Sequence, residues 1–316
     1  MSEEAVSLFP IKDEIRKLSS NNFKRLNSVT AENFITTYLD SLKGFYREEN
    51  FELNEFLADF RVMKEHRNYF MAFINLVAES DKIKLGEFIA KIFEQIYNTL
   101  SDLHFFAPQA NCCRNASFDI FKLHIWELFL CSVTYLLHNE LFHELSEVLV
   151  HTYFLRRYVL SDERQESTYG AFYFNPCALD NQLKRLHDFK QLLTPIGHLL
   201  CVEREYRPIY TGKAIANTDL FLFQIQDGLE LGIADSPSWY PMCYIYATTD
   251  YSMWQKLKSR KFCERMFKLF DVESIEDLKQ KISRCRSKPT FIYDNVIIPA
   301  PTIHNFITIQ DIGTLP

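Results

Sequence analysis

Hydrophobic residues recur every three or four positions over much of the N-terminal part of the chain. This spacing places them on one face of a helix and predicts an α-helix wherever it continues for several turns. After Thr30, which is expected to cap a helix, Phe34, Tyr38, Leu42 and Phe45 share one face. We expect helices over residues 13–19, 31–46, 53–78, 84–100, 124–138, 140–151 and 181–193.

The pattern changes after Pro208. Apolar and β-branched residues there form short runs, which are bounded by turn signals such as DG and DSPS. Two amphipathic stretches separate these runs, and Ser274 is expected to cap the second of them. We expect strands in residues 219–226, 229–234, 239–247, 290–298 and 305–309, and helices in residues 251–270 and 274–285.

The distribution of helix-breaking residues supports this division. Only two of the eight glycines and two of the eleven prolines precede Gly170. Because glycine and proline disfavour helix interiors, their scarcity favours a long helical region. The sequence therefore predicts a mostly α protein, with an all-helical N-terminal domain over residues 1–203. A smaller mixed α/β (α+β) domain with short strands and a basic helix pair is expected over residues 204–316.

The cysteines and the apolar runs indicate the compartment. The chain opens MSEEAVSLFP, which has neither the basic start nor the apolar core of a signal peptide. There is no C-x-x-C pair, and the vicinal Cys112–Cys113 has poor geometry for a disulfide. We therefore expect reduced thiols in a cytoplasmic protein. The longest apolar run, Leu128 to Leu137, is shorter than the ~20 residues of a membrane span, so no membrane contact is expected.

Acidic residues and histidines gather on one side of the predicted helix after Asn139. Glu140-Leu-Phe-His143 matches the Glu-x-x-His element of di-iron bundles. That architecture needs a second such element, and the sequence has none. We therefore interpret this side of the helix as a solvated polar face and expect no metal. The polar side carries Glu140, His143, Glu144, Glu147 and His151.

The preceding helix carries a second polar set opposite its apolar face, formed by His124, Glu127, Cys131 and His138. A cysteine near glutamate and histidine is typical of a nucleophile or of a metal site. However, His124 and His138 are about 21 Å apart along a helix, so the four cannot meet at one ion. A semi-polar packing face is the favoured interpretation.

The hexapeptide Arg61-Val-Met-Lys-Glu-His66 resembles the Arg-x4–6-His pattern of HEPN-type ribonucleases. The resemblance implies a helical protein in which Arg61 and His66 cleave RNA without a metal, usually across a dimer. The polar residue that often follows the family's arginine is absent here. On one continuous helix the two side chains would also diverge by ~140°.

No other motif in the sequence fixes a chemistry. There is no G-x-S-x-G, H-E-x-x-H or G-x-G-x-x-G pattern and no zinc-type spacing of cysteine and histidine. We therefore expect no cofactor. These absences favour a binding protein over an enzyme.

Positive charge is concentrated near the C-terminus of an acidic chain. Residues 256–288 hold eleven Lys/Arg and five Asp/Glu, a net +6, so the remainder of a chain of net charge −6 carries −12. On a single helix, Trp254, Lys258, Lys261, Arg265 and Lys268 fall in one ~80° sector. An exposed ridge of this kind is typical of a surface that binds nucleic acid or another anionic partner. The alternative is an ordinary solvated face.

The leading hypothesis is a non-catalytic interaction or adaptor subunit of a larger assembly. It would contact a protein partner, nucleic acid or another anionic partner through the basic stripe, and a homo-oligomer is compatible with it. The helix HIWELFLCSVTYLLHNELF is also similar to helical segments of bacterial proteins linked to phage defence, without any defining motif. That likeness implies a role in a bacterial defence system. The alternative hypothesis is a HEPN-like, metal-independent ribonuclease that uses Arg61 and His66.

Overall fold

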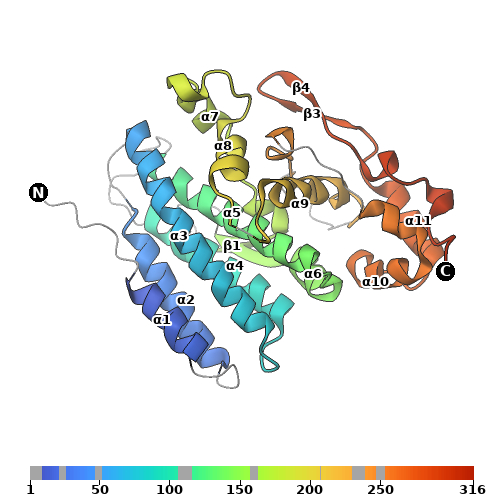
Figure 1. Ribbon diagram of the computed structural model, residues 1–316, viewed down its shortest axis with the longest axis horizontal. Coiled ribbons are helices and arrows are strands. Elements are labelled where there is room, and N and C mark those ends of the chain that lie inside the picture. The colour runs from blue at the N-terminus through green and yellow to red at the C-terminus, as the bar shows by residue number, and fades with distance from the viewer. Residues whose placement is uncertain are drawn as a thin grey trace, which may run out of the picture. The chain divides into compact units, whose positions relative to one another are not determined.

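The computed structural model describes residues 9–20, 26–46, 52–105, 116–156, 163–206, 208–229, 239–246 and 253–316. Helices dominate these ranges, and the named strands form two two-stranded sheets (Figure 1). The prediction of a mostly α fold is therefore confirmed.

The chain divides into two compact units and passes between them more than once. Unit 1 comprises residues 1–132 and 153–166, and unit 2 comprises residues 133–152 and 167–316. The expected boundary after residue 203 therefore lies inside unit 2. Long-range packing is one reason why residues before 203 belong to unit 2. The hydroxyl of Tyr169 donates to the carbonyl oxygen of Leu222, another residue of this unit, at 3.2 Å.

Unit 1 consists mainly of long helices whose apolar faces meet in an aromatic core, and Figure 1 shows α1 to α4 running beside one another. Phe34 stacks on Phe73 with ring centroids 4.0 Å apart, and Phe93 meets Phe129 edge-on at 5.1 Å. The helices are α1 (Phe9–Ser20), α2 (Ser28–Lys43), α3 (Leu53–Ala78), α4 (Leu85–Phe105) and the first part of α5 (Ala116–His138).

The N-cap of α2 differs from the predicted one. The side chain of Asn27 accepts a hydrogen bond from the Thr30 N–H at 3.0 Å, and the Thr30 hydroxyl oxygen accepts one from the Asn27 N–H at 3.0 Å. This reciprocal arrangement is a capping box, in which the first residue is the cap. The helix therefore begins at Ser28, and Thr30 is its third residue.

The N-terminal region was predicted to contain helices only, but a small two-stranded sheet lies within it. β1 (Tyr153–Arg156) pairs with β2 (Arg164–Ser167). Asn98 of α4 donates to the Phe154 carbonyl at 3.0 Å and accepts from the Arg156 N–H at 2.9 Å. This contact across 56 residues supports an extended conformation that two short strands would barely hold alone.

Unit 2 contains shorter helices, and α9 (Gly212–Ile225) is the longest described helix that lies wholly within it. Two of them, α6 and α10, pack closely together: Phe142 meets Phe262 edge-on at 5.5 Å, and the Ser146 hydroxyl donates to the Lys268 carbonyl at 2.8 Å. The predicted helix over 181–193 was largely wrong, since α7 ends at Leu183 and residues 184–193 form turns and a short 3₁₀ helix. The other helices are α6 (Phe142–Leu149), α7 (Cys177–Leu183), α8 (Pro195–His198), α10 (Arg260–Phe270) and α11 (Ile275–Arg284).

Residues 219–226 were predicted to form a strand, but 219–225 lie in α9. Thr211 caps this helix through its hydroxyl, which accepts from the Ala214 N–H at 3.2 Å. Every side chain from Thr218 to Ile225 is buried. Without a polar face, the sequence of such a helix cannot be distinguished from that of a buried strand by its periodicity.

The other predicted strands have mixed outcomes. Residues 290–298 do form strands, as a hairpin of β3 (Thr290–Tyr293) and β4 (Val296–Pro299). Asp294 and Asn295 have φ of 49° and 63°, which is typical of a type I′ turn. The predicted strands over 239–247 and 305–309 were wrong for the described residues 239–246 and 305–309, which contain or border short 3₁₀ turns. Residues 230–234 of the remaining segment lie outside the described residues.

Helix α5 is the most apolar long helix in the described part of the chain. Over Phe118–His138 its mean hydropathy is 1.4, and by length and composition this window could cross a membrane. This window is longer than the apolar run from Leu128 to Leu137 on which the sequence prediction was based. However, 89% of the window is buried inside the protein, as in the core helix of a globular domain.

The six cysteines within the described ranges are free thiols, and five of them are buried. Cys201 lies beside Cys243 and donates to its carbonyl oxygen at 3.4 Å. The Cys112–Cys113 pair lies outside the described residues.

Candidate functional site

The five residues of the predicted basic stripe do not share one helix. Trp254 and Lys258 belong to a 3₁₀ turn, and the extended conformation of Ser259 separates this turn from α10. Trp254 is fully buried, donates from Nε1 to the Gln224 Oε1 at 2.7 Å, and stacks on Phe221. The prediction of an exposed Trp254 on the ridge was therefore wrong, because the break at Ser259 changes the helical phase.

The four cations of the predicted stripe are all exposed. Lys258 lies 3.8 Å from the Asp311 carboxylate, and Arg265 pairs with Glu140. Within the described parts of the chain, no acid pairs with Lys261 or Lys268. We define the α10 cation face as Lys261, Arg265 and Lys268, which are spaced i, i+4 and i+7 on one side of α10.

Glu140 occupies an unusual backbone position at the end of α5. Its φ is 53°, in the left-handed region that glycine normally fills at a helix C-terminus. The Leu141 N–H donates to the Leu136 carbonyl at 2.9 Å, and the Glu140 N–H donates to the Leu137 carbonyl at 3.2 Å. These two hydrogen bonds satisfy two of the last four carbonyls of α5 and close the helix with a turn at Glu140.

The Glu140 carboxylate bridges two cations. Lys256 Nζ lies 2.9 Å from Oε1, and Arg265 Nη1 donates to Oε2. The hydrogen bonds from Lys256 and then from Arg265 lower the pKa of Glu140. Aromatic rings lie beneath both cations, with the Arg265 guanidinium 5.3 Å from the Phe142 ring centroid and Lys256 Nζ 5.7 Å from that of Phe262. Electrostatic and cation–π contacts therefore fix the geometry of this cluster.

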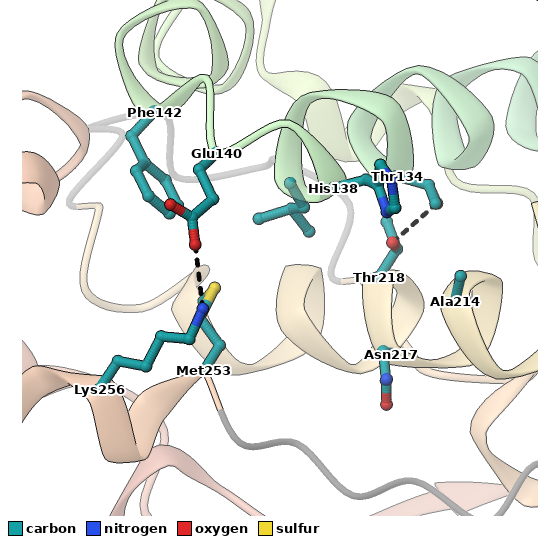
Figure 2. Close-up of a pocket in the computed structure, with 10 residues that line it drawn as sticks. Thr134, His138, Glu140, Phe142, Ala214, Asn217, Thr218, Met253 and Lys256 are labelled. Atoms are coloured by element: carbon teal, nitrogen blue, oxygen red, sulfur yellow. Dashed lines mark hydrogen bonds and ion pairs between the residues drawn. The ribbon is translucent and has the colours of Figure 1, made fainter. Parts of the chain in front are cut away.

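A pocket of about 330 Å³ adjoins the Glu140 cluster within unit 2 (Figure 2). Helices α5 and α9 form two of its walls with side chains spaced three or four residues apart. The Thr134 and Thr218 hydroxyls meet there at 2.7 Å and are both buried. The wall residues are Thr134, Leu137 and His138 of α5, Ala214, Asn217 and Thr218 of α9, and Glu140, Phe142, Met253 and Lys256.

The structure does not bring Arg61 and His66 together at an open cleft. Both lie on the continuous helix α3, where Arg61 is exposed and His66 is fully buried. His66 lies edge-on to Phe45, 5.2 Å between ring centroids. Burial lowers the pKa of His66 to about 4, so its imidazole is neutral at neutral pH. An enclosed, neutral imidazole of this kind cannot reach an RNA substrate.

Three residues of the polar set on α5, His124, Glu127 and Cys131, form a buried network in unit 1 rather than a site. His124 Nε2 lies 2.7 Å from the Tyr38 hydroxyl, and Glu127 Oε1 lies 3.0 Å from Arg67 Nη1. The same Arg67 nitrogen is 3.8 Å from the Cys131 sulfur. These contacts agree with a packing face, and they show that its main partner is an arginine of α3.

Two further histidines of the predicted polar faces, His138 and His143, are exposed and do not join the buried network. His138 is exposed at the end of α5 and lines the pocket. His143 is exposed to solvent and lies 3.2 Å from the Glu147 carboxylate. Across the described ranges, no three His, Cys, Asp or Glu side chains gather closely enough to hold a metal ion.

Sequence reasoning missed most of the pocket residues. Lys256 and Glu140 are 116 positions apart, and Thr134 and Thr218 are 84 apart, so local patterns could not pair them. Comparison of the chain with protein-family models, curated proteins and solved structures finds no match.

Proposed function

We propose that the protein is a non-catalytic binding subunit that contacts a polyanionic partner, nucleic acid in the first place, through the α10 cation face. The observation that carries this proposal is the row of three exposed cations on one side of α10. Lys261 and Lys268 have no acid partner among the described residues, so their charge is available to a ligand. The surrounding segment, 256–288, carries +6 in a chain of net charge −6.

The burial of Trp254 limits how such a partner would be bound. No tryptophan projects from this face to stack on a base, so the contact would involve charge and the phosphate backbone. Binding of this type is independent of base sequence and weakens steeply as salt rises. Arg265 contributes less than a free arginine would, because its guanidinium is already paired with Glu140.

The experiment measures binding of fluorescein-labelled single-stranded and duplex oligonucleotides over a range of salt concentrations. The double variant Lys261→Glu/Lys268→Glu should bind all sequences more weakly and lower the salt slope by roughly two units. The matched control is Lys12→Glu/Lys190→Glu, which makes the same change in net charge at exposed lysines that are not part of α10. Loss of affinity in both variants alike, or in neither, would overturn the role of the α10 cation face.

The ribonuclease alternative has less support. It requires His66 at an accessible surface, whereas this side chain is fully buried in unit 1. Lys258, the fourth predicted cation, lies near Asp311 and just before α10, so it can contribute to the positive potential without belonging to the row.

A further inference from the structure

The pocket beside Glu140 has the size and the lining of a small-molecule site. Its volume of about 330 Å³ falls at the lower end of the range for such sites, roughly 300–1,000 Å³. Figure 2 shows Met253 and Lys256 toward one side of the view, and His138 with the Thr134–Thr218 pair toward the other. A ligand that filled the pocket would therefore meet different chemistry at its two ends.

The charges at the Lys256 end favour an anion. Among the described lining residues Glu140 is the one acid, and its two oxygens already accept from Lys256 and Arg265. These three side chains together carry one net positive charge. An ammonium group has three donors, and the hydrogen bond to Glu140 uses one donor of Lys256, so the others can face a ligand.

The two helix ends near the pocket do not change this sign. Ala214 lies in the first turn of α9, where the aligned peptide dipoles present partial positive charge, but its N–H already donates to the Thr211 hydroxyl, and the Gly212 N–H donates to the Glu205 carboxylate. At the C-terminal end of α5, the Leu136 and Leu137 carbonyls likewise accept from the Leu141 and Glu140 N–H groups. The net positive charge of Lys256, Arg265 and Glu140 therefore decides the sign of the pocket.

The remaining walls suggest the shape of the ligand. Leu137, Phe142 and Met253 supply apolar surface, and His138 and Thr218 supply polar groups away from Lys256. We propose that this pocket binds a small organic anion. Its carboxylate or phosphate lies at Lys256, a compact aromatic or aliphatic body contacts Leu137 and Met253, and a polar substituent reaches His138.

This site is distinct from the proposed contact on the α10 cation face. Lys261 and Lys268 do not line the pocket, and Lys256 does not belong to that face. Failure of oligonucleotide binding would therefore leave the pocket proposal standing, and the reverse also holds.

The test uses the full chain and a matched series of probes that differ mainly in charge: 4-hydroxyphenylacetate, tyrosol and tyramine. Phenyl phosphate distinguishes a phosphate preference from a carboxylate preference. Calorimetric titration should show binding of at least one anion, with tyrosol and tyramine at least about tenfold weaker, as expected for loss of a charge-assisted contact. No binding by any probe, or equal binding of anion, neutral molecule and cation, would overturn the proposal.

Variants then locate the site. Lys256→Gln should weaken anion binding at least about tenfold, and Lys256→Arg should restore most of it. Ala214→Leu should remove binding by filling the pocket without changing its charge. Lys258→Gln is the control, because it removes the same charge from an exposed lysine that does not line the pocket.

Thermal unfolding of each variant confirms that it is folded before its affinity is interpreted. Binding that survives both Ala214→Leu and Lys256→Gln would place the ligand elsewhere and refute the assignment.

Discussion

The Arg265 guanidinium donates hydrogen bonds to both the side chain and the main chain of Glu140. One guanidinium nitrogen donates to the carboxylate, and Nη2 donates to the Glu140 carbonyl oxygen at 3.0 Å. That carbonyl belongs to a residue in the left-handed conformation, which costs a residue with a side chain roughly 1–2 kcal/mol. Arg265 thus connects the turn at Glu140, which lines the pocket, to the α10 cation face.

Two substitutions of Glu140 should separate the cost of this conformation from the value of its contacts. Glu140→Ala and Glu140→Gly both lose the carboxylate, but only alanine retains the strain of a positive φ. We predict that Glu140→Ala is less stable than Glu140→Gly by about 1 kcal/mol in urea unfolding. Equal stabilities would mean that the left-handed turn is absent in solution.

Asp219 should make stability depend on pH. The carboxylate is fully buried and accepts from Trp239 Nε1 and from the Cys243 N–H, each at 2.7 Å. Burial raises the pKa of Asp219 to about 7, despite these hydrogen bonds. Between the ordinary carboxyl pKa of about 3.9 and about 7, the folded state keeps a proton that the unfolded state releases. Its contribution to stability therefore falls as pH rises through that window.

The measurement is the difference between wild type and Asp219→Asn, from urea unfolding at several pH values. This difference is needed because His66, whose pKa is lowered to about 4, has the opposite effect: the unfolded state binds its proton more readily. Wild type should lose stability relative to the variant as pH increases from about 4 to about 7. A difference that stays constant, or changes in the other direction, would show that Asp219 is ionised throughout.

The buried ion pair of unit 1 should be strongly non-additive. Arg67 Nη1 and Glu127 Oε1 are 3.0 Å apart, and both side chains are at most 3% exposed. Glu127→Leu or Arg67→Met alone leaves a buried charge and should cost about 3–5 kcal/mol. The double variant should cost clearly less than the sum, as measured by a double-mutant cycle. Additive losses would contradict direct pairing in the core.

Trp254→Phe should lower stability without weakening the binding of nucleic acid. Phenylalanine can still stack on Phe221, but it leaves the Gln224 oxygen without its indole donor, which costs about 1–3 kcal/mol. Thermal unfolding and oligonucleotide titration of the same sample would check both parts. A variant of normal stability that binds single strands more weakly would instead support an exposed Trp254.

The helices with one apolar face could be predicted from the sequence, and those without such a face could not. Residues 53–78 were expected to form a helix, and α3 has the same bounds. α9 was mistaken for a strand because its second half is buried on all sides. The prediction of a single basic stripe was wrong for a different reason. A helical wheel assumes a continuous helix, and a serine at position 259 does not by itself indicate that the helix is interrupted there.

The residues of the candidate sites were partly visible beforehand. The exposed lysines and Arg265 were identified because local charge density is a property of the sequence. Their acid partners were not, since Glu140 is 125 positions from Arg265. Likewise, the polar side of α5 was recognised as a packing face, but Arg67, which neutralises it, lies 60 positions away from Glu127.

The interleaved division of the chain has a consequence for its synthesis. Helix α6 belongs to unit 2 but is made before the last segment of unit 1, residues 153–166. Its closest partner, α10, follows more than a hundred residues later. At ribosomal rates of roughly 5–20 residues per second, Phe142 and its apolar neighbours must wait on the order of ten seconds for Phe262 to emerge. Nascent chains stalled in that interval should be captured by chaperones that bind apolar segments, and chains extended past Phe270 should be released.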